Sequence, residues 1–448
     1  MLQWQALGAA VAWLVALNSA SPPSVTTIHA NRVVGGGAVD TVAQLQELLD
    51  SRPGSIFHVR NSRWEVSNRT IMLRSNRSLI MDASTVITGT AEVPWTKHGT
   101  GQVGEGGGAL LTVSGNNISV AGGRFEQTIL PACAEVKSQP TPGACNFAID
   151  IYYSSGITLR DAIIQGSFMT AVRVQESIGW PAGIKPGMPP VASRWVTLPG
   201  LARQPVLITN VTLLHHQNHT FFQLRGFWTV MAANVIFVRN KILGPFGYAI
   251  DLDSSSSGNL VTNNYMQGCL WEGIFTEYSA VHNVITGNKV VANCTYDQAI
   301  HINGELNIVV DNVALRLDGT PAGIACTSQL KMYNSYALSN RIIGNTCGHL
   351  ALGGDGGCDN YLADNTANVS VAGATVPTVT NWFQPPNRSI CIAGTDTIEA
   401  AEVKNTGGKL ELPHTVTIIC NRLQPVGTPV DTVAQLQALL DANTNTGK

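Results

Sequence analysis

Short apolar and polar runs alternate from residue 110 to residue 420, and Val, Ile and Thr recur there at every second position. An alternation with a period of two predicts β-strands with one buried face, and the stretch has no helical periodicity. Within it, a unit Asn-x4-Asn with apolar residues inside occurs five times. The copies span residues 259–264, 283–288, 307–312, 340–345 and 360–365.

The spacing of these copies predicts a solenoid. Successive copies begin 24, 24, 33 and 20 residues apart. One short unit cannot bury its own apolar side, whereas stacked copies of the unit bury a continuous core. Asn residues at matching turn positions fit this arrangement, because stacked Asn side chains can bond from rung to rung as ladders.

The end of a solenoid exposes unpaired strands and needs a cap. Residues 39–50 supply one, since Asp40 or Thr41 can cap a short amphipathic helix. The apolar side of this helix includes Val42, Leu45, Leu48 and Leu49. Residues 430–441 repeat the segment with a single difference. We interpret residues 430–448 either as the start of a truncated second unit or as a second cap on the C-terminal end.

The opening rungs at residues 54–90, together with the repeats, resemble the right-handed parallel β-helix proteins of the pectate-lyase-like superfamily. The resemblance covers residues 39–422. It implies an all-β fold, a single-stranded right-handed parallel β-helix (β-solenoid) with a short N-terminal capping helix. Lyases, hydrolases, epimerases and non-catalytic adhesins share this scaffold, so the fold alone does not decide the function.

Seven segments align when the rungs are matched by their Asn positions: 148–152, 171–175, 221–225, 249–253, 273–277, 299–303 and 329–333. Alternate residues of a strand point to opposite faces. Thirteen of the fourteen residues expected to face inward are apolar, whereas seven of the fourteen expected to face outward are charged. The charge content of the whole chain is only 12%. This predicts a functional groove on the outward face, with a merely solvated sheet face as the alternative.

Three carboxylates stand out on the outward face, namely Asp251, Asp253 and Glu277. Rungs stack about 4.8 Å apart and alternate residues lie about 6.6 Å apart, so the three should be neighbours. Either at least one of their pKa values rises, which gives a general acid, or a cation sits among them, for which Ca²⁺ is suited. Arg225, His301 and Lys331 lie within a few rungs and complete the set of expected catalytic residues.

Other outward side chains are expected to bind substrate. They are Asp150, Tyr152, Arg173, Gln223, Phe275, Asn303 and Tyr333. Two interruptions, at 133–145 and 176–205, are expected to wall the groove. Trp180 and Trp195 on the longer one are candidates for stacking on sugar rings, or alternatively pin that segment onto the solenoid.

A narrower resemblance concerns mannuronan C5-epimerases, which place a Tyr, then an Asp and a His within one strand, and an Asp one rung later. This chain has Tyr248, Asp251 and Asp253 in YAIDLD, followed by Glu277. Asp253 stands where the epimerases have their catalytic His. The nearest imidazole, that of His301, is two rungs further on.

The composition and the N-terminal residues limit the partners and the cellular location that we expect. Lys and Arg number 27 against 29 Asp and Glu, a net charge of -2, which excludes the basic surface that nucleic acid needs. Residues 6–17 are apolar and precede small polar residues, so residues 1–20 are expected to be a signal peptide. A short membrane anchor is the alternative, but the run is shorter than the roughly 20 residues of a membrane span.

Cysteines and glycosylation sequons indicate export from the cytoplasm, as the expected signal peptide does. None of the nine cysteines has CxxC spacing, so disulfides with one leftover thiol are favoured over zinc. Eight Asn-x-Ser/Thr sequons suggest a glycoprotein. We therefore expect a secreted protein that acts on uronate-containing polysaccharide by lyase or epimerase chemistry, or by acid–base glycoside hydrolysis. The alternative is a non-catalytic extracellular glycan-binding or adhesive matrix glycoprotein. Neither reading involves nucleic acid or stable membrane insertion.

Overall fold

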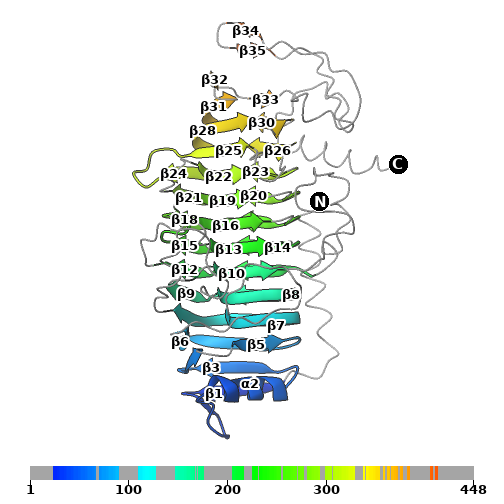
Figure 1. Cartoon of the computed structure of the whole chain (residues 1–448), viewed down its shortest axis with the longest axis vertical. Helices are drawn as coiled ribbons and strands as arrows, with labels where there is room; N and C mark the ends of the chain where they lie inside the picture. The colour runs from blue at the N-terminus through cyan, green and yellow to red at the C-terminus, as the bar shows by residue number, and fades with distance from the viewer. Residues whose placement is uncertain are drawn as a thin grey trace, which may run out of the picture.

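A computed structural model describes residues 24–66, 70–89, 109–127, 147–175, 204–215, 225–371, 374–376, 381–383, 404–406 and 409–411, without 167, 169, 231, 254–255, 270, 277–279, 293–297, 305, 328–336, 339, 354–356, 359–360 and 364. The chain coils upward as a stack of strands, with the N-terminal helix α2 at one end (Figure 1). Each coil contributes a strand, or part of a longer strand, to each of three parallel faces of the stack, which are called the first, second and third sheets. Within the described residues, no helix is long and apolar enough to cross a membrane.

The first sheet contains the strands that the Asn-x4-Asn units enclose. It consists of β1 (Val25–His29), β3 (Ile56–Arg60), parts of β6 (Ser78–Gly89), β7 (Ala109–Gln127) and β8 (Phe147–Arg160), then β11 (Val206–Thr209), β14 (Val235–Val238), β17 (Leu260–Thr262), β20 (Val284–Thr286), β23 (Ile308–Val310), β27 (Arg341–Ile343) and β30 (Tyr361–Ala363).

The second sheet follows the first around each coil. It consists of β4 (Arg63–Val66), the ends of β6 and β7, β9 (Ile163–Gly166), β12 (Thr212–Leu214), β15 (Lys241–Leu243), β18 (Tyr265–Gln267), β21 (Lys289–Ala292), β24 (Val313–Arg316) and the start of β28 (Thr346–Gly353).

The third sheet carries the charged residues. It consists of β5 (Ile71–Arg74), the starts of β7 and β8, β10 (Thr170–Gln175), β13 (Arg225–Val230), β16 (Tyr248–Asp253), β19 (Glu272–Thr276), β22 (Gln298–Ile302), β25 (Gly323–Thr327), the rest of β28, and β31 (Thr366–Val371).

Short antiparallel strands flank the stack. β2 (Arg32–Val33) pairs with β1, whereas β32 (Ala374–Val376) and β33 (Asn381–Phe383) pair with β31 and β30. Two further pairs are β26 (Ala337–Leu338) with β29 (Gly357–Cys358), which is parallel, and β34 (Lys404–Thr406) with β35 (Lys409–Glu411), which is antiparallel.

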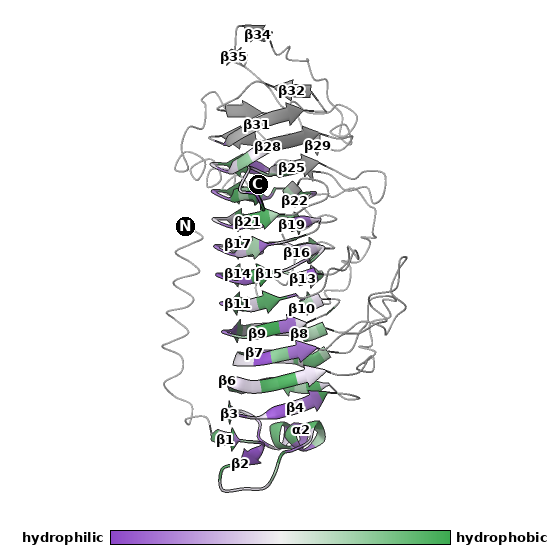
Figure 2. Ribbon diagram, turned by 90° about the vertical axis from the view of Figure 1, so that its left-hand side faces the viewer, coloured by the Kyte–Doolittle hydropathy of each residue, from purple (hydrophilic) through white to green (hydrophobic). Residues whose placement is uncertain are grey.

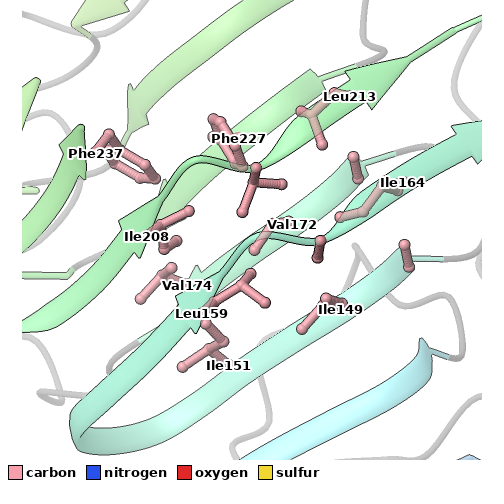
Figure 3. Close-up of a cluster of buried hydrophobic side chains, with 14 of the residues drawn as sticks. Ile149, Ile151, Leu159, Ile164, Val172, Val174, Ile208, Leu213, Phe227 and Phe237 are labelled. Atoms are coloured by element: carbon pink, nitrogen blue, oxygen red, sulfur yellow. The ribbon is translucent and has the colours of Figure 1, made fainter. Parts of the chain in front are cut away.

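Inward-facing side chains from all three sheets fill the interior. Figure 3 shows Ile149, Val172 and Phe227 of the third sheet, with Ile208 and Phe237 of the first and Leu213 of the second, among the buried side chains of one core cluster. Figure 2 shows that hydrophobic and hydrophilic residues both occur along the strands of the stack. The inward prediction is confirmed for the described residues of strands β8, β10, β16, β19 and β22, whose inward side chains are all buried.

Two ladders of Asn, buried except for the half-buried Asn365, hold the corners on either side of the first sheet, as predicted. One contains Asn259, Asn283, Asn307 and Asn340, and the other Asn240, Asn264, Asn288, Asn312, Asn345 and Asn365. In each step the Nδ2 atom donates to the Oδ1 atom of the next Asn at 2.9–3.1 Å, and Oδ1 also accepts a backbone N–H from the preceding rung. Each side chain thus satisfies its own polar atoms and those of the turn.

The helix α2 (Val42–Ser51) closes the N-terminal end as predicted. Thr41 is the N-cap, and its hydroxyl accepts from the backbone N–H of Gln44, whose side chain returns a bond to the backbone of Thr41. Val42, Leu45 and Leu49 are buried, and Leu48 packs against the same core. The strand β1 precedes the helix and pairs with β3, so the parallel stack already includes residues before position 39.

Cysteines whose side chains are described, Cys269 and Cys347, are both buried, and no disulfide forms among them. Burial raises the pKa of the Cys347 thiol to about 12. The loop cysteines Cys133 and Cys145 lie outside the described residues, as do the expected signal peptide 1–20 and the repeated segment 430–448.

Candidate functional site

The predicted charged residues share one face of the third sheet. Paired positions on successive strands form a middle column of Asp150, Arg173, Trp228, Asp251, Phe275 and His301. Asp253 and Asn303 each follow two residues later on the same face, because Leu252 and Ile302 between them point into the core. The sequence pattern therefore identified a real face of the coil.

Two of the seven predicted strands are out of register. Residues 221–225 do not supply the rung before β16, because β13 begins at Arg225 and pairs Phe227 with Ile250. Arg225 therefore lies beside Tyr248 rather than beside Asp253, and Trp228 lies beside Asp251. After β22 the next rung is β25, in which Ala325 takes the position expected for Lys331.

Several predicted residues lie outside the described residues. They are Trp180, Trp195, Gln223, Glu277, Lys331 and Tyr333. Among the described residues no group of three His, Cys, Asp or Glu side chains could hold a metal ion. The Ca²⁺ set of Asp251, Asp253 and Glu277 thus remains a prediction, and its member Asp251 already contacts a cationic side chain.

The outward face is buried, which contradicts the alternative of a merely solvated sheet face. None of the nine predicted site residues with described side chains is more than 8% exposed. These residues are Asp150, Tyr152, Arg173, Arg225, Asp251, Asp253, Phe275, His301 and Asn303. Charged groups in such surroundings must be paired, or must shift their pKa.

Asp150 and Arg173 form the first buried ion pair. The Arg173 Nε and Nη2 atoms donate to the two carboxylate oxygens of Asp150 at 3.0 and 2.8 Å. The Arg173 guanidinium also lies 4.1 Å from the ring centroid of Phe147. A bidentate pair stacked on an aromatic ring satisfies both charges, as structural ion pairs do.

Asp251 is bound differently. Its Oδ2 atom accepts from Arg225 Nε at 2.5 Å, while its Oδ1 atom has no hydrogen-bond partner, as judged from the part of the chain that the structure describes. Burial raises the pKa of Asp251 to about 8; the charges of Asp253 and Glu272 also raise it, and Arg225 lowers it. The raised pKa favours the protonated form of this carboxyl group near neutral pH.

The neighbouring carboxylate of Asp253 lies two residues further along β16. Its Oδ2 atom accepts from Trp228 Nε1 at 3.1 Å. Arg225 lies over the Trp228 ring, 4.4 Å from its centroid, so one indole supports both acidic side chains. The two Asp residues thus differ in their partners although they share one strand and one face.

A second ionisable pair lies on the following strands, and sequence reasoning missed one half of it. His301 Nδ1 lies 3.2 Å from Glu272 Oε1, and both side chains are buried. The His301 ring packs on Phe275 with centroids 5.0 Å apart, and Phe275 stacks on Tyr248 at 5.3 Å. The imidazole is therefore held on one side by an aromatic ring and at Nδ1 by a carboxylate.

The sequence pattern did not predict Glu272, because inward and outward positions do not alternate strictly at the start of these strands. Ala249 and Ile250 are consecutive yet both belong to the core. A Cβ at the equivalent Gly273 would lie 2.2 Å from Val290 Cγ1, so that position also faces inward. The preceding residues, Tyr248 and Glu272, are thereby turned to the outer face. A small residue recurring at Ala148, Ala171, Ala249, Gly273 and Ala299 was the signal for this change.

Solved structures of three proteins illustrate the likeness of the coil. The A-module of the Azotobacter vinelandii mannuronan C-5 epimerase AlgE6 has 11% identity and a TM-score of 0.46, with 74% of this chain and 94% of that chain covered. The endo-xylogalacturonan hydrolase from Aspergillus tubingensis has 12% identity and a TM-score of 0.48, with 78% of this chain and 93% of that chain covered. The Streptococcus pneumoniae surface protein and adhesin PfbA has 13% identity and a TM-score of 0.40, with 73% of this chain and 91% of that chain covered.

The names of these three proteins give three different roles, those of an epimerase, a hydrolase and an adhesin. A search of curated proteins found no match to the sequence. Residues 205–315 match the family model described as "Right handed beta helix region". Together with the three parallel sheets, this match identifies the chain as a right-handed parallel β-helix.

Proposed function

We propose that this chain is a carbohydrate-active enzyme that cleaves glycosidic bonds, with Asp251 as general acid and Asp253 as general base. The observation that carries the proposal is the state of Asp251. Arg225 occupies Oδ2, so the proton belongs on Oδ1, the oxygen without a partner among the described residues. A protonated, unengaged oxygen next to a second carboxylate is the arrangement that acid–base hydrolysis requires.

The reaction follows from these two roles. Asp251 Oδ1 gives its proton to the glycosidic oxygen, which leaves with the bonding electron pair as the C–O bond breaks. A water molecule adds its oxygen to the anomeric carbon and gives its proton to Asp253. This single displacement inverts the anomeric centre, and it requires about 6.5–9.5 Å between the two carboxyl groups to accommodate the water molecule.

A uronate lyase or epimerase is the second candidate, and the pair of His301 and Glu272 favours it. An imidazole held at Nδ1 by a carboxylate is suited to remove a proton next to a uronate carboxyl group. However, this chemistry also needs a cation that neutralises the uronate, and Arg225 is already paired with Asp251. Hydrolysis uses the observed contacts without breaking any of them.

The test uses a panel of neutral and uronate polysaccharides. Hydrolysis produces new reducing ends without absorbance from unsaturated sugars, whereas a lyase produces both. Proton NMR of the first product formed distinguishes inversion from retention. If no glycan is cleaved or epimerised although some bind tightly, the protein is a non-catalytic glycan-binding rod, and the proposal is wrong. An extracellular location belongs to the same proposal and is supported by the apolar stretch at residues 6–17.

A further inference from the structure

Two polar side chains beyond the acid pair have a common property that catalysis by Asp251 and Asp253 leaves unexplained. Glu272 Oε2 and both amide atoms of Asn303 are buried and have no hydrogen-bond partner within the described residues. His301 lies between them in the structure, bonded to Glu272 and two residues before Asn303. Buried polar atoms without partners are costly, and a group of them indicates a place for a ligand.

The backbone turns these side chains to the same face. Ile300 and Ile302 belong to the core, so His301 and Asn303 project to the outer side of the third sheet. Gly273 and Ile274 occupy inward positions on β19, which turns Glu272 outward, where it contacts His301. Glu272 lies three residues before Phe275, which pairs with His301, and its side chain reaches along the sheet to within 3.2 Å of His301 Nδ1. Asn303 lies about 6.6 Å beyond His301, so the three groups form one row along the outer face.

The apolar surroundings of the group also suit a sugar. Phe275 lies between Asp251 and His301 in the middle column, and its ring is stacked between Tyr248 and the imidazole. Aromatic rings flanked by hydrogen-bonding groups are the usual composition of small-molecule sites.

We infer that Glu272, His301 and Asn303 form a subsite that binds a neutral sugar ring of the glycan, next to the unit cleaved at Asp251. This inference rests on the proposed function only in taking a glycan as the ligand. Glu272 Oε2 and Asn303 Oδ1 accept from two sugar hydroxyl groups, and Asn303 Nδ2 donates to a hydroxyl oxygen. The carboxylate of Glu272 repels the carboxylate of a uronate, so the subsite selects against a sugar acid.

Binding is measured by calorimetry with the Asp251→Asn protein, so that no probe is consumed. The probes are xylotetraose, mannotetraose, galactotetraose and cellotetraose, with tetragalacturonate and tetramannuronate as acidic counterparts. We expect at least one neutral probe to bind more tightly than either acidic one. Adding Asn303→Leu or Glu272→Gln should weaken that binding about tenfold each, the loss of roughly one hydrogen bond.

Gln127 provides the matched control. It is a buried amide on β7 whose two side-chain polar atoms also lack partners among the described residues, and it lies many rungs away from β22. Gln127→Leu should leave the affinity unchanged. Thermal melts of all variants show that a loss of affinity is not a loss of folding.

The results separate the subsite from the reaction. Unchanged affinity after both substitutions, tighter binding of an acidic probe, or no binding of any probe would overturn the subsite, even if the wild-type protein hydrolyses a glycan. Conversely, binding that depends on Asn303 and Glu272 in a protein without turnover would support the subsite and contradict the proposed hydrolase.

Discussion

The Asn ladders and the outer face of the third sheet around Asp251, called here the Asp251 face, are both buried and polar. They differ in whether their polar atoms have hydrogen-bond partners. In the ladders the Nδ2 atom of Asn288 donates to Asn312 and to backbone carbonyls, while its Oδ1 accepts from Asn264. On the other face Asp251 and Asn303 keep atoms without partners among the described residues. The difference teaches that the ladder residues serve the fold, whereas the Asp251 face retains polar groups that the fold does not use.

The largest expected effect is on turnover, and it comes from a substitution on the face whose polar atoms lack hydrogen-bond partners among the described residues. Asp251→Asn should lower the rate of hydrolysis by about 10²- to 10⁴-fold, the usual contribution of a general acid. The protein should remain folded, because the neutral amide replaces a carboxyl group whose raised pKa favours the neutral form at pH 7. Reducing-end assays and thermal melts measure the two properties, and unfolding of this variant would make Asp251 a structural residue.

The next largest effect is expected on stability, from a substitution in one of the Asn ladders. Asn288→Ala leaves buried atoms of its neighbours without partners, each at a cost of about 1 to 3 kcal/mol. Urea unfolding should show a loss of about 3 kcal/mol or more in the free energy of unfolding. A loss similar to that of an exposed Asn, such as Asn117→Ala, would mean that the ladder contributes little.

The pH dependence sharpens the same contrast. The pKa of Asp251 is raised from 3.8 to about 8, so between these values the folded protein holds a proton that the unfolded chain has released. The contribution of this group to stability therefore falls as pH rises from about 4 to about 8 and is constant above that range. Turnover should also fall above pH 8, as the acid loses its proton.

Melting temperatures of the wild type and Asp251→Asn across this pH range measure the effect. The difference between the two proteins should change in favour of the variant as the pH rises. A constant difference would contradict the raised pKa.

A smaller effect is expected at Asn303. Asn303→Leu replaces an amide that has no hydrogen-bond partner in the described part of the chain by an apolar group of similar size, so the free energy of unfolding should change by less than about 1 kcal/mol. Thermal melts beside Asn288→Ala provide the comparison. Equal losses at the two positions would erase the distinction between the two regions.

The smallest effect is expected from removing Ca²⁺. Arg225 already supplies a positive charge to Asp251, so dialysis against EDTA should change neither the melting temperature nor turnover. A fall in either that added Ca²⁺ restores would instead support a cation bound among Asp251, Asp253 and Glu277.

The fold could be predicted because its signals are local and repeated. Pairs of Asn five positions apart fix both corners of the first sheet, and the alternation of Ile and charged residues fixes the register of β16, β19 and β22. The register of β13 could not be obtained in this way. The Asn residues that follow this segment, Asn234 and Asn240, are six positions apart rather than five, and residues 221–225 alternate as well as residues 226–230 do.

The site was predicted only in part, for a different reason. Alternation places Asp251, Asp253 and His301 on one face, but burial depends on the whole packed molecule and not on a strand's own pattern. Glu272 was missed because two consecutive residues face inward at the start of its strand, which a period of two does not describe. The contrast between Asp251 and Asp150 likewise depends on where Arg225 and Arg173 reach across neighbouring strands.

The two Asn corners also decide where the coil tolerates change. Each Asn-x4-Asn unit has a fixed internal length, although successive units start 24, 24, 33 and 20 residues apart. All variation in length is therefore accommodated outside the first sheet, in the connections that border the third. An engineer who inserts or shortens loops at those connections would reshape the surroundings of Asp251 and leave the stacking of the rungs intact, so this scaffold separates the part that can diversify from the part that must not.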